Sequence, residues 1–549
     1  MRTSNNKLYL ALGMALTSTL FTGCGGSGGT NTSNTNTVTP PVTPTPAVPD
    51  TTSPTWQAGQ FSPSSQFAHR CEAPRTGTDP FENTPYPDVA GTMMHEKMWL
   101  RSFSYETYLW YDEIIDNDPS DFTTVAAYFA QLKTFQKTAS GKDKDQFHFS
   151  ESYEDYKKES QDGVSASFGL AWTIPQSRMA YVAYVNDNTP AANAGVQRGD
   201  RLLKVGDLDF ATFNGRDNEQ YNQILTAFTP RQNQVVTLTL LDRNGQEKVV
   251  TMTAQDLELK PVKNTHILEH AGKQVGYVQF NQFTASAQSG LIDAFRQFSQ
   301  NNIDELILDM RYNGGGIVIQ ASQLSYMIAG SQTNGRNFSI KTHNIKQSSK
   351  NEPLGFIEQS VNWTTLRLNN DQLPSPQMER VYILATGDTA SASESVINAL
   401  RGIDVEVILI GDDTRGKPFG FVPEQNCGTV YYTIQNKSAN AKGFGDYEDG
   451  FIVTPQTSIV GEIGLDARVP GCRLDDDFSK ELGDNSERLF AGALHHIATG
   501  NCPEPERQGR TSYSQSVTVP NTMNDAAPFT LPFQPLKHGA VYTDIKMDK

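Results

Sequence analysis

Residues 381–417 read VYILATGDTASASESVINALRGIDVEVILIGDDTRGK, and this stretch decides the fold class. Val381–Leu384 is a short apolar run, typical of a buried strand, and small residues follow it up to Ser393. Apolar residues then recur at the spacing of one helical face, and a second apolar run covers Val405–Ile410. The stretch therefore predicts a strand, a serine-rich turn, a helix and a neighbouring strand, as in an α/β layer protein.

A serine at such a strand-to-helix turn can serve as a nucleophile. The first N–H groups of a helix lack partners within the helix, and its positive dipole end stabilises an alkoxide or an oxyanion. The serine also needs a base, which is a histidine or a lysine kept neutral by desolvation. No histidine lies between His343 and His495, so Lys417 is the nearer candidate. Taken alone, the two segments fit a catalytic pair and a plain tight turn with a solvated lysine equally well.

A third segment favours catalysis. The apolar run 305–310 is followed by Arg311–Gly316, which reads RYNGGG. Three consecutive glycines let main-chain N–H groups approach a ligand closely, as an oxyanion hole requires. A flexible turn is the alternative reading.

Together the three segments resemble the tail-specific, or C-terminal-processing, serine peptidase family. The family motifs Ser-Ala-Ser-Glu, Thr-x-Gly-Lys and Asp-x-Arg-x-Asn-x-Gly-Gly stand here at 391–394, 414–417 and 309–316. The resemblance implies Ser391 as the nucleophile and Lys417 as the general base of a serine endopeptidase that forms an acyl-enzyme. It also implies oxyanion donors from four N–H groups, those of Ala392, Gly314, Gly315 and Gly316.

One position departs from the family pattern. The family often has a glutamine four residues after the lysine, where this chain has Phe421. The usual orienting partner of Lys417 is therefore missing, so a non-catalytic peptide-binding relative stays an alternative. A carrier of hydrophobic ligands on the same core is a further alternative, which the intact serine and lysine motifs disfavour.

Alternating strands and helices extend this pattern to a catalytic domain over 265–500. Strands are expected at 275–280 and 305–310, with helices near 289–300 and 318–328. A capping-box-like start at Asp484–Glu487 predicts one more helix. The resemblance implies a crotonase-like α/β core, which periodicity alone cannot select.

Residues 160–260 read as a PDZ-like β module. Asn244-Gly245 between two strand-like runs predicts a hairpin with a type I′ turn, which needs positive φ at both positions. Residues 188–200 resemble the helix and turn of a PDZ domain. The loop formed by Phe168, Gly169 and Leu170 resembles the one whose N–H groups capture a peptide C-terminus. A module that only supports the protease is the alternative.

The N-terminal 24 residues resemble a lipoprotein export signal. Two basic residues precede an apolar core that is too short to span a bilayer, and Cys24 stands where a lipobox cysteine would be diacylated. An ordinary secretory signal is the alternative. A lipid anchor would place the protein in the cell envelope, periplasmic or on the outer membrane of a Gram-negative cell. Residues 25–54 are too polar and proline-rich to fold, which predicts a tether.

Aromatic residues at helical spacing predict an N-terminal helical subdomain over 70–158, where a packed core is favoured over a ligand site. The tail 503–549 shows no sustained period.

The net charge of −16 argues against nucleic acid and against an anionic membrane surface, so we expect polypeptide substrates and membrane contact through the lipid alone. We expect no cofactor, and no metal at the two weak candidates, His495-His496 and the acidic turn 446–449. The sequence leaves the oligomeric state open.

Four cysteines remain after Cys24: Cys71, Cys427, Cys472 and Cys502. An even number in an oxidising compartment predicts two disulfides, with three possible connectivities. We favour Cys427–Cys472 within the catalytic domain and Cys71–Cys502 between its ends.

Overall fold

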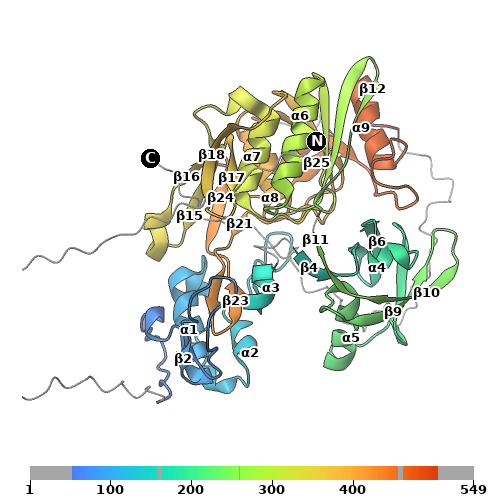
Figure 1. Cartoon of the computed structure of the whole chain (residues 1–549). Helices are drawn as coiled ribbons and strands as arrows, with labels where there is room; N and C mark the ends of the chain where they lie inside the picture. The colour runs from blue at the N-terminus through green and yellow to red at the C-terminus, as the bar shows by residue number, and fades with distance from the viewer. Residues whose placement is uncertain (1–51, 159–163, 259, 456–460, 505–549) are drawn as a thin grey trace, which may run out of the picture. The chain divides into compact units, whose positions relative to one another are not determined.

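The computed structural model describes residues 52–158, 164–258, 260–455 and 461–504 (Figure 1). Cys24, the export signal, most of the tether and all but the start of the C-terminal tail lie outside the described residues. The centre is a seven-stranded sheet of order β12-β13-β14-β19-β20-β26-β25, in which only the β12–β13 pair is antiparallel. Its strands are β12 Val262–His270, β13 Lys273–Phe280, β14 Glu305–Asp309, β19 Arg380–Ala385, β20 Glu406–Gly411, β25 Ile452–Thr454 and β26 Arg468–Arg473.

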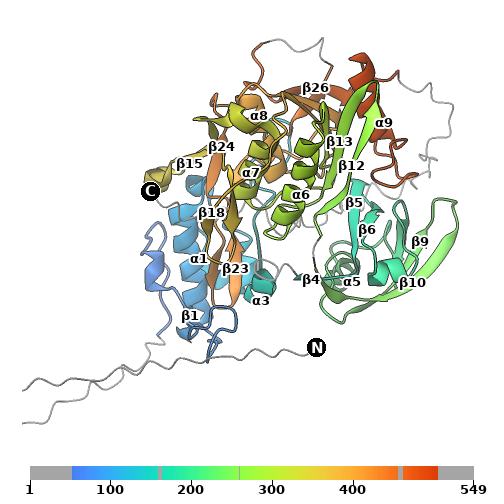
Figure 2. The same ribbon diagram turned by 45° about the horizontal axis from the view of Figure 1, so that its top comes forward.

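Helices cover both faces of this sheet (Figure 2). One face packs on α6 Ala287–Gln300, α7 Val318–Ala329 and α8 Ala392–Gly402, and the other on α9 Arg488–Thr499. Successive strand residues alternate between the two cores, so that Leu306 belongs to the first and Ile307 to the second. Because both faces are buried, the strands read as continuous apolar runs. The predicted α/β core and its element order are confirmed.

The predicted start of the last helix is wrong by one turn. Glu487 is itself the N-cap of α9, and its carboxylate accepts the N–H groups of Leu489 and Phe490. Residues 484–486 form a turn before the helix, in which Asp484 accepts from Ser486. A carboxylate at the N-cap satisfies the first helical donors without a capping box.

The PDZ-like module is a separate sheet of order β10-β9-β7-β6-β5, with β8 paired to β7 and β5 at an edge. Its elements are β5 Leu170–Gln176, β6 Met179–Val185, α4 Pro190–Asn193, β7 Arg201–Val205, β8 Leu208–Asp209, α5 Asn218–Phe228, β9 Val235–Leu241 and β10 Glu247–Thr253, beside the pair β4 Val164–Ser167 and β11 Gln255–Glu258. The hairpin is confirmed but its turn is not type I′. Of its two central residues only Gly245 has positive φ, and Gly245 N–H donates to Asp242 O across a five-residue loop.

The N-terminal subdomain is less helical than its aromatic spacing predicts. It holds α1 Met93–Thr107, α2 Val125–Phe129 and α3 Tyr153–Lys157, while the aromatic run after Tyr108 follows the end of α1. Its strand β3 Phe149–Ser152 pairs with β23 Thr429–Tyr432 of the catalytic domain, so segments far apart in sequence share one small sheet. The other strands are β1 Arg70–Cys71, β2 Val89–Ala90, β15 Asn337–His343, β16 Pro353–Gly355, β17 Gln359–Asn362, β18 Arg367–Gln372, β21 Phe419–Gly420, β22 Glu424–Asn426 and β24 Asn436–Ala439.

The disulfides are Cys71–Cys427 and Cys472–Cys502, so the pairing favoured from the sequence is wrong. Cys427 lies in the β22–β23 turn, beside the N-terminal subdomain that carries Cys71. Cys472 lies in β26 and packs in the apolar core that α9 covers. Cys502 lies three residues after the end of α9, where it bonds to Cys472. One bond therefore ties the N-terminal subdomain to the catalytic domain.

Candidate active site

Ser391, the predicted nucleophile, lies at the N-cap of α8 in a conformation that is unusual for a residue with a side chain. Its φ is 60° and its ψ is −112°, and its side chain is fully buried. Such backbone angles cost free energy and persist only where the surrounding structure enforces them. Here the Ser391 N–H donates to Glu394 Oε2 at 2.8 Å.

The glycine loop after β14 packs directly on this turn. A Cβ added to Gly315 would lie 2.8 Å from Ser391 Cβ and 2.9 Å from Ala392 N, so a side chain there has no room. The main-chain oxygen of Asn313 accepts the Ala390 N–H at 3.1 Å. It also accepts the Ser393 hydroxyl at 2.8 Å. The structure therefore brings the glycine loop and the serine turn together.

The predicted oxyanion donors are not equivalent. The Gly315 N–H donates to Asn313 Oδ1 at 3.0 Å, which commits it within the loop. Ala392 is the first residue of α8, where an N–H has no partner inside the helix. The remaining candidates for an oxyanion are therefore the N–H groups of Ala392, Gly314 and Gly316.

Lys417 follows β20 and is 1% exposed. Its Nζ lies 4.0 Å from the ring centre of Phe421 and 5.0 Å from that of Phe147. Burial lowers the pKa of Lys417 to about 7, while the carboxylates of Asp145 and Glu394 oppose this and Arg415 adds to it. A large fraction of the amine is therefore neutral at neutral pH and able to accept a proton.

Glu394 connects the serine turn and the lysine loop. Its Oε2 accepts the N–H groups of Ser391 and Lys417, both at 2.8 Å. Its Oε1 accepts the Thr414 hydroxyl at 2.6 Å and the Gly416 N–H at 2.7 Å. Burial raises the pKa of Glu394, and these four hydrogen bonds oppose that rise. The sequence motifs contain Glu394 and Thr414, but the sequence alone gave neither a role.

Comparisons with known proteins show which family this chain is similar to. Residues 274–440 match peptidase family S41. Over this segment the chain resembles the tail-specific serine peptidase family. A carboxyl-terminal-processing protease from a Picosynechococcus strain is 23% identical over 262 residues, 47% of this chain and 56% of the relative. Another from a Synechocystis strain is 28% identical over 262 residues, 46% of this chain and 53% of the relative.

The chain spans about half the length of the curated relatives it matches. The crystal structure of a putative S41 protease from Bacteroides fragilis has a TM-score of 0.52 and 22% identity. The match covers 76% of this chain and 98% of the Bacteroides fragilis chain. This likeness shows a shared fold.

The loop predicted to bind a substrate carboxylate lies in the PDZ-like module, whereas Ser391 lies at the start of α8. Phe168 is a core residue, 2% exposed, and Leu170 begins the edge strand β5. Gly169 has a φ of 84°, and its N–H donates to Ser167 Oγ at 2.9 Å. The same edge strand reaches the serine turn, because Thr173 Oγ1 donates to Asp388 Oδ2 at 2.6 Å.

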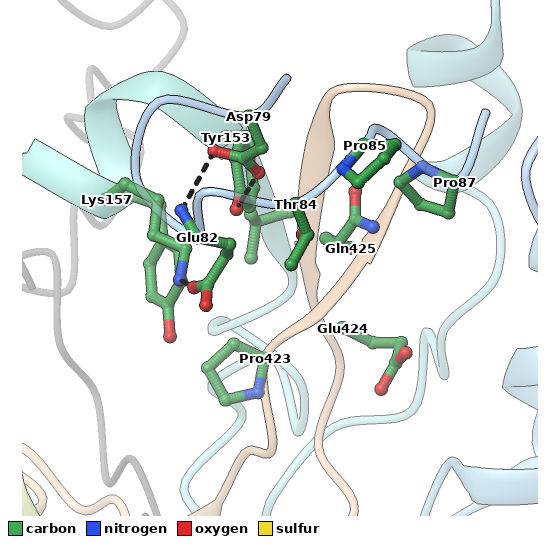
Figure 3. Close-up of a pocket in the computed structure, with 12 residues that line it drawn as sticks. Asp79, Glu82, Thr84, Pro85, Pro87, Tyr153, Lys157, Pro423, Glu424 and Gln425 are labelled. Carbon is green, nitrogen blue, oxygen red and sulfur yellow. Dashed lines mark hydrogen bonds and ion pairs between the residues drawn. The ribbon is translucent and has the colours of Figure 1, made fainter. Parts of the chain in front are cut away.

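A cavity of about 360 Å³ lies where the N-terminal subdomain meets the β22–β23 region (Figure 3). Tyr153 and Lys157 of α3 line one side and Glu424 another, and Tyr153 OH donates to Asp79 Oδ2 at 2.6 Å. Its lining contains none of the predicted catalytic residues.

Over the described ranges, no group of three or more His, Cys, Asp and Glu side chains could hold a metal ion. None of the described helices is long and apolar enough to cross a membrane.

Proposed function

We propose that this protein is a serine endopeptidase that hydrolyses polypeptides through an acyl-enzyme on Ser391, with Lys417 as the general base. The observation that carries the proposal is the pair of loops held by Glu394, one with a buried serine at a helix N-terminus and the other with a buried, desolvated lysine. A solvated surface lysine, the plain alternative, would be exposed. Phe421 replaces a polar orienting partner with an aromatic ring that excludes water.

The proposed reaction assigns one role to each of these groups. Neutral Lys417 accepts the Ser391 hydroxyl proton as Oγ attacks the substrate carbonyl carbon, and the N–H groups of Ala392 and the glycine loop stabilise the oxyanion. The Lys417 ammonium then gives its proton to the departing amine. Water hydrolyses the resulting ester with Lys417 again as the base, which restores the serine.

Hydrolysis of an unfolded polypeptide tests the function. The wild-type chain is expected to cleave it, and Ser391→Ala is expected to be inactive while its thermal unfolding is unchanged. A folded wild-type protein that cleaves none of a varied set of unfolded polypeptides would instead support the non-catalytic, peptide-binding relative.

The second part of the proposal is that the PDZ-like module selects polypeptide C-termini. The edge position of β5 supports it, because a peptide can add there as a further strand. A peptide carboxylate at Gly169 would replace the Ser167 hydroxyl as the acceptor of the Gly169 N–H.

Amidating the C-terminus of a binding peptide is expected to weaken its affinity for the protein at least ~10-fold, because a charge-assisted hydrogen bond is lost. Fluorescence anisotropy with acid and amide forms of one peptide measures this. Equal affinities would show that recognition lies elsewhere.

The third part is attachment to a membrane of the cell envelope by a diacyl group on Cys24, with 25–54 as the tether. Cys24→Ala is expected to abolish incorporation of labelled fatty acid and to release the protein from the membrane fraction. Fatty acid found on the Cys24→Ala protein would contradict the lipobox reading.

A further inference from the structure

Some of the side chains that surround the Lys417 amine belong to the N-terminal subdomain. Lys417 Nζ lies 4.0 Å from the ring centre of Phe421, which follows β21, and 5.0 Å from that of Phe147, in the segment that leads into β3. Both rings are buried and belong to one apolar cluster with Tyr108 and Phe419. The pairing of β3 with β23 and the Cys71–Cys427 disulfide hold this segment on the catalytic domain.

Asp145, two residues before Phe147, is a fully buried carboxylate. Tyr108 OH donates to its Oδ2 at 2.6 Å, and the Phe147 N–H donates to its Oδ1 at 2.9 Å. Both donors are neutral groups, so they fix the carboxylate without cancelling its charge. His148 Nδ1 lies 3.9 Å from Oδ2, but burial lowers the pKa of His148 to about 4, which leaves that ring neutral at pH 7.

We propose that the N-terminal subdomain is part of the catalytic centre, with Asp145 as a positioning residue that stabilises the Lys417 ammonium and Phe147 as the side chain that keeps water from it. This inference rests on the proposed peptidase function and extends it to residues outside the matched peptidase segment.

The two residues act on opposite protonation states of the base. Between attack and departure of the amine, Lys417 holds the serine proton as a buried cation, which a nearby carboxylate stabilises. Between turnovers the amine must be neutral, which an apolar wall favours. In a chain whose position 421 is an aromatic residue, Asp145 takes the place of a polar partner for the base.

The other charged groups near Lys417 or Asp145 make contacts of their own. Glu394 raises the pKa of Lys417 and also holds four donors of the two loops. Arg415 lowers that pKa, and its guanidinium lies 3.8 Å from Asp388. Lys133 Nζ donates to the main-chain oxygen of Asp145 at 3.1 Å. None of these groups is changed in the variants below.

The pH dependence of kcat/KM in Asp145→Asn and Phe147→Ala tests the proposal. Asp145→Asn removes a negative charge, so the acid limb of the profile is expected to move to lower pH, and the maximal rate is expected to fall ~10-fold or more. Phe147→Ala admits water, so its limb is expected to move to higher pH. Asp143→Asn is the matched control, because Asp143 lies in the same segment but is exposed and pairs with exposed Lys137.

A direct titration of Lys417 separates this proposal from the function it rests on. The ¹³Cε resonance of Lys417, assigned by its loss in Lys417→Arg, reports the pKa of the amine whether or not the protein cleaves peptides. Opposite displacements of that pKa in Asp145→Asn and Phe147→Ala are expected, and Phe147→Leu replaces Phe147→Ala if the latter unfolds. An unchanged pKa in the folded variants, or displacements of the same sign, would overturn the proposal.

Discussion

Lys417→Arg is expected to lose at least ~100-fold in kcat/KM, because a general base contributes ~10²–10⁴-fold and a guanidinium is not deprotonated in proteins. The substitution keeps the positive charge, so a merely electrostatic role for Lys417 would survive it. Steady-state hydrolysis of a fluorogenic peptide measures the loss, with thermal unfolding as the check on folding. Lys437→Arg is the matched control, since Lys437 is a lysine that pairs with Asp446 and Glu448.

The pH dependence of kcat/KM in the wild-type protein is expected to report the ionisation of Lys417. Only neutral Lys417 accepts the serine proton, so kcat/KM is expected to rise with pH on one ionisation near the lowered pKa of about 7 and then level off. An ionisation near the free-lysine value of ~10.4 would contradict the desolvated base. Substantial activity in folded Lys417→Arg or Lys417→Ala would rule out the dyad and return a distant histidine to consideration.

The pH dependence of the unfolding free energy tests the lowered pKa of Lys417 without any substrate. The folded state holds Lys417 with a pKa of about 7, whereas the unfolded chain has the ordinary value near ~10.4. Between these values the unfolded chain binds the extra proton, so this group makes stability rise with pH by up to about 1.4 kcal/mol per pH unit. Lys417→Met is expected to flatten that part of the curve of unfolding free energy against pH. An unchanged slope in the variant would show that Lys417 is not buried as a neutral amine.

Glu394→Gln is expected to lower kcat ~100-fold and to destabilise the fold, because its oxygens accept four hydrogen bonds in a buried site. A carboxamide replaces one acceptor oxygen with an NH₂ group, which would face donors, and each unsatisfied buried group costs about 1–3 kcal/mol. Losing the negative charge also lowers the pKa of Lys417, so the acid limb is expected to move to lower pH.

Peptide hydrolysis across pH, with thermal unfolding, measures these effects. Glu406→Gln is a control, since Glu406 is a half-exposed glutamate in β20. A Glu394→Gln protein with wild-type kcat would show that the carboxylate does not hold the two loops in the reactive arrangement.

The α/β core could be predicted from the local sequence, because the burial of each strand and helix sets the spacing of its apolar residues. Apolar runs such as Val381–Leu384 are continuous since β19 is covered on both faces, and the helical spacing after Ser393 marks the side of α8 that packs into the apolar core. The segments that carry Ser391 and Lys417 could be expected to lie close together, because they follow β19 and β20, which are neighbouring parallel strands.

Features that depend on distant segments could not be read from the sequence. Cys71 pairs with Cys427 because the N-terminal subdomain lies on the β22–β23 hairpin, and no local signal marks that contact. Asp145 and Phe147 reach Lys417 through the same pairing. The aromatic residues that follow Tyr108 have α-helical spacing but form only the short 3-10 helix Tyr111–Glu113, because tertiary contacts override the local preference.

Covalent labelling with a fluorophosphonate, located by peptide mass mapping, tests the central claim most directly. The adduct is expected on Ser391 in the wild-type protein, absent in Ser391→Ala and formed at least ~100-fold more slowly in Lys417→Arg. Ser393→Ala is expected to keep the label, because the Ser393 hydroxyl already donates to the main-chain oxygen of Asn313. A folded wild-type protein that takes up no label, or takes it up on a serine other than Ser391, would contradict the Ser391–Lys417 mechanism.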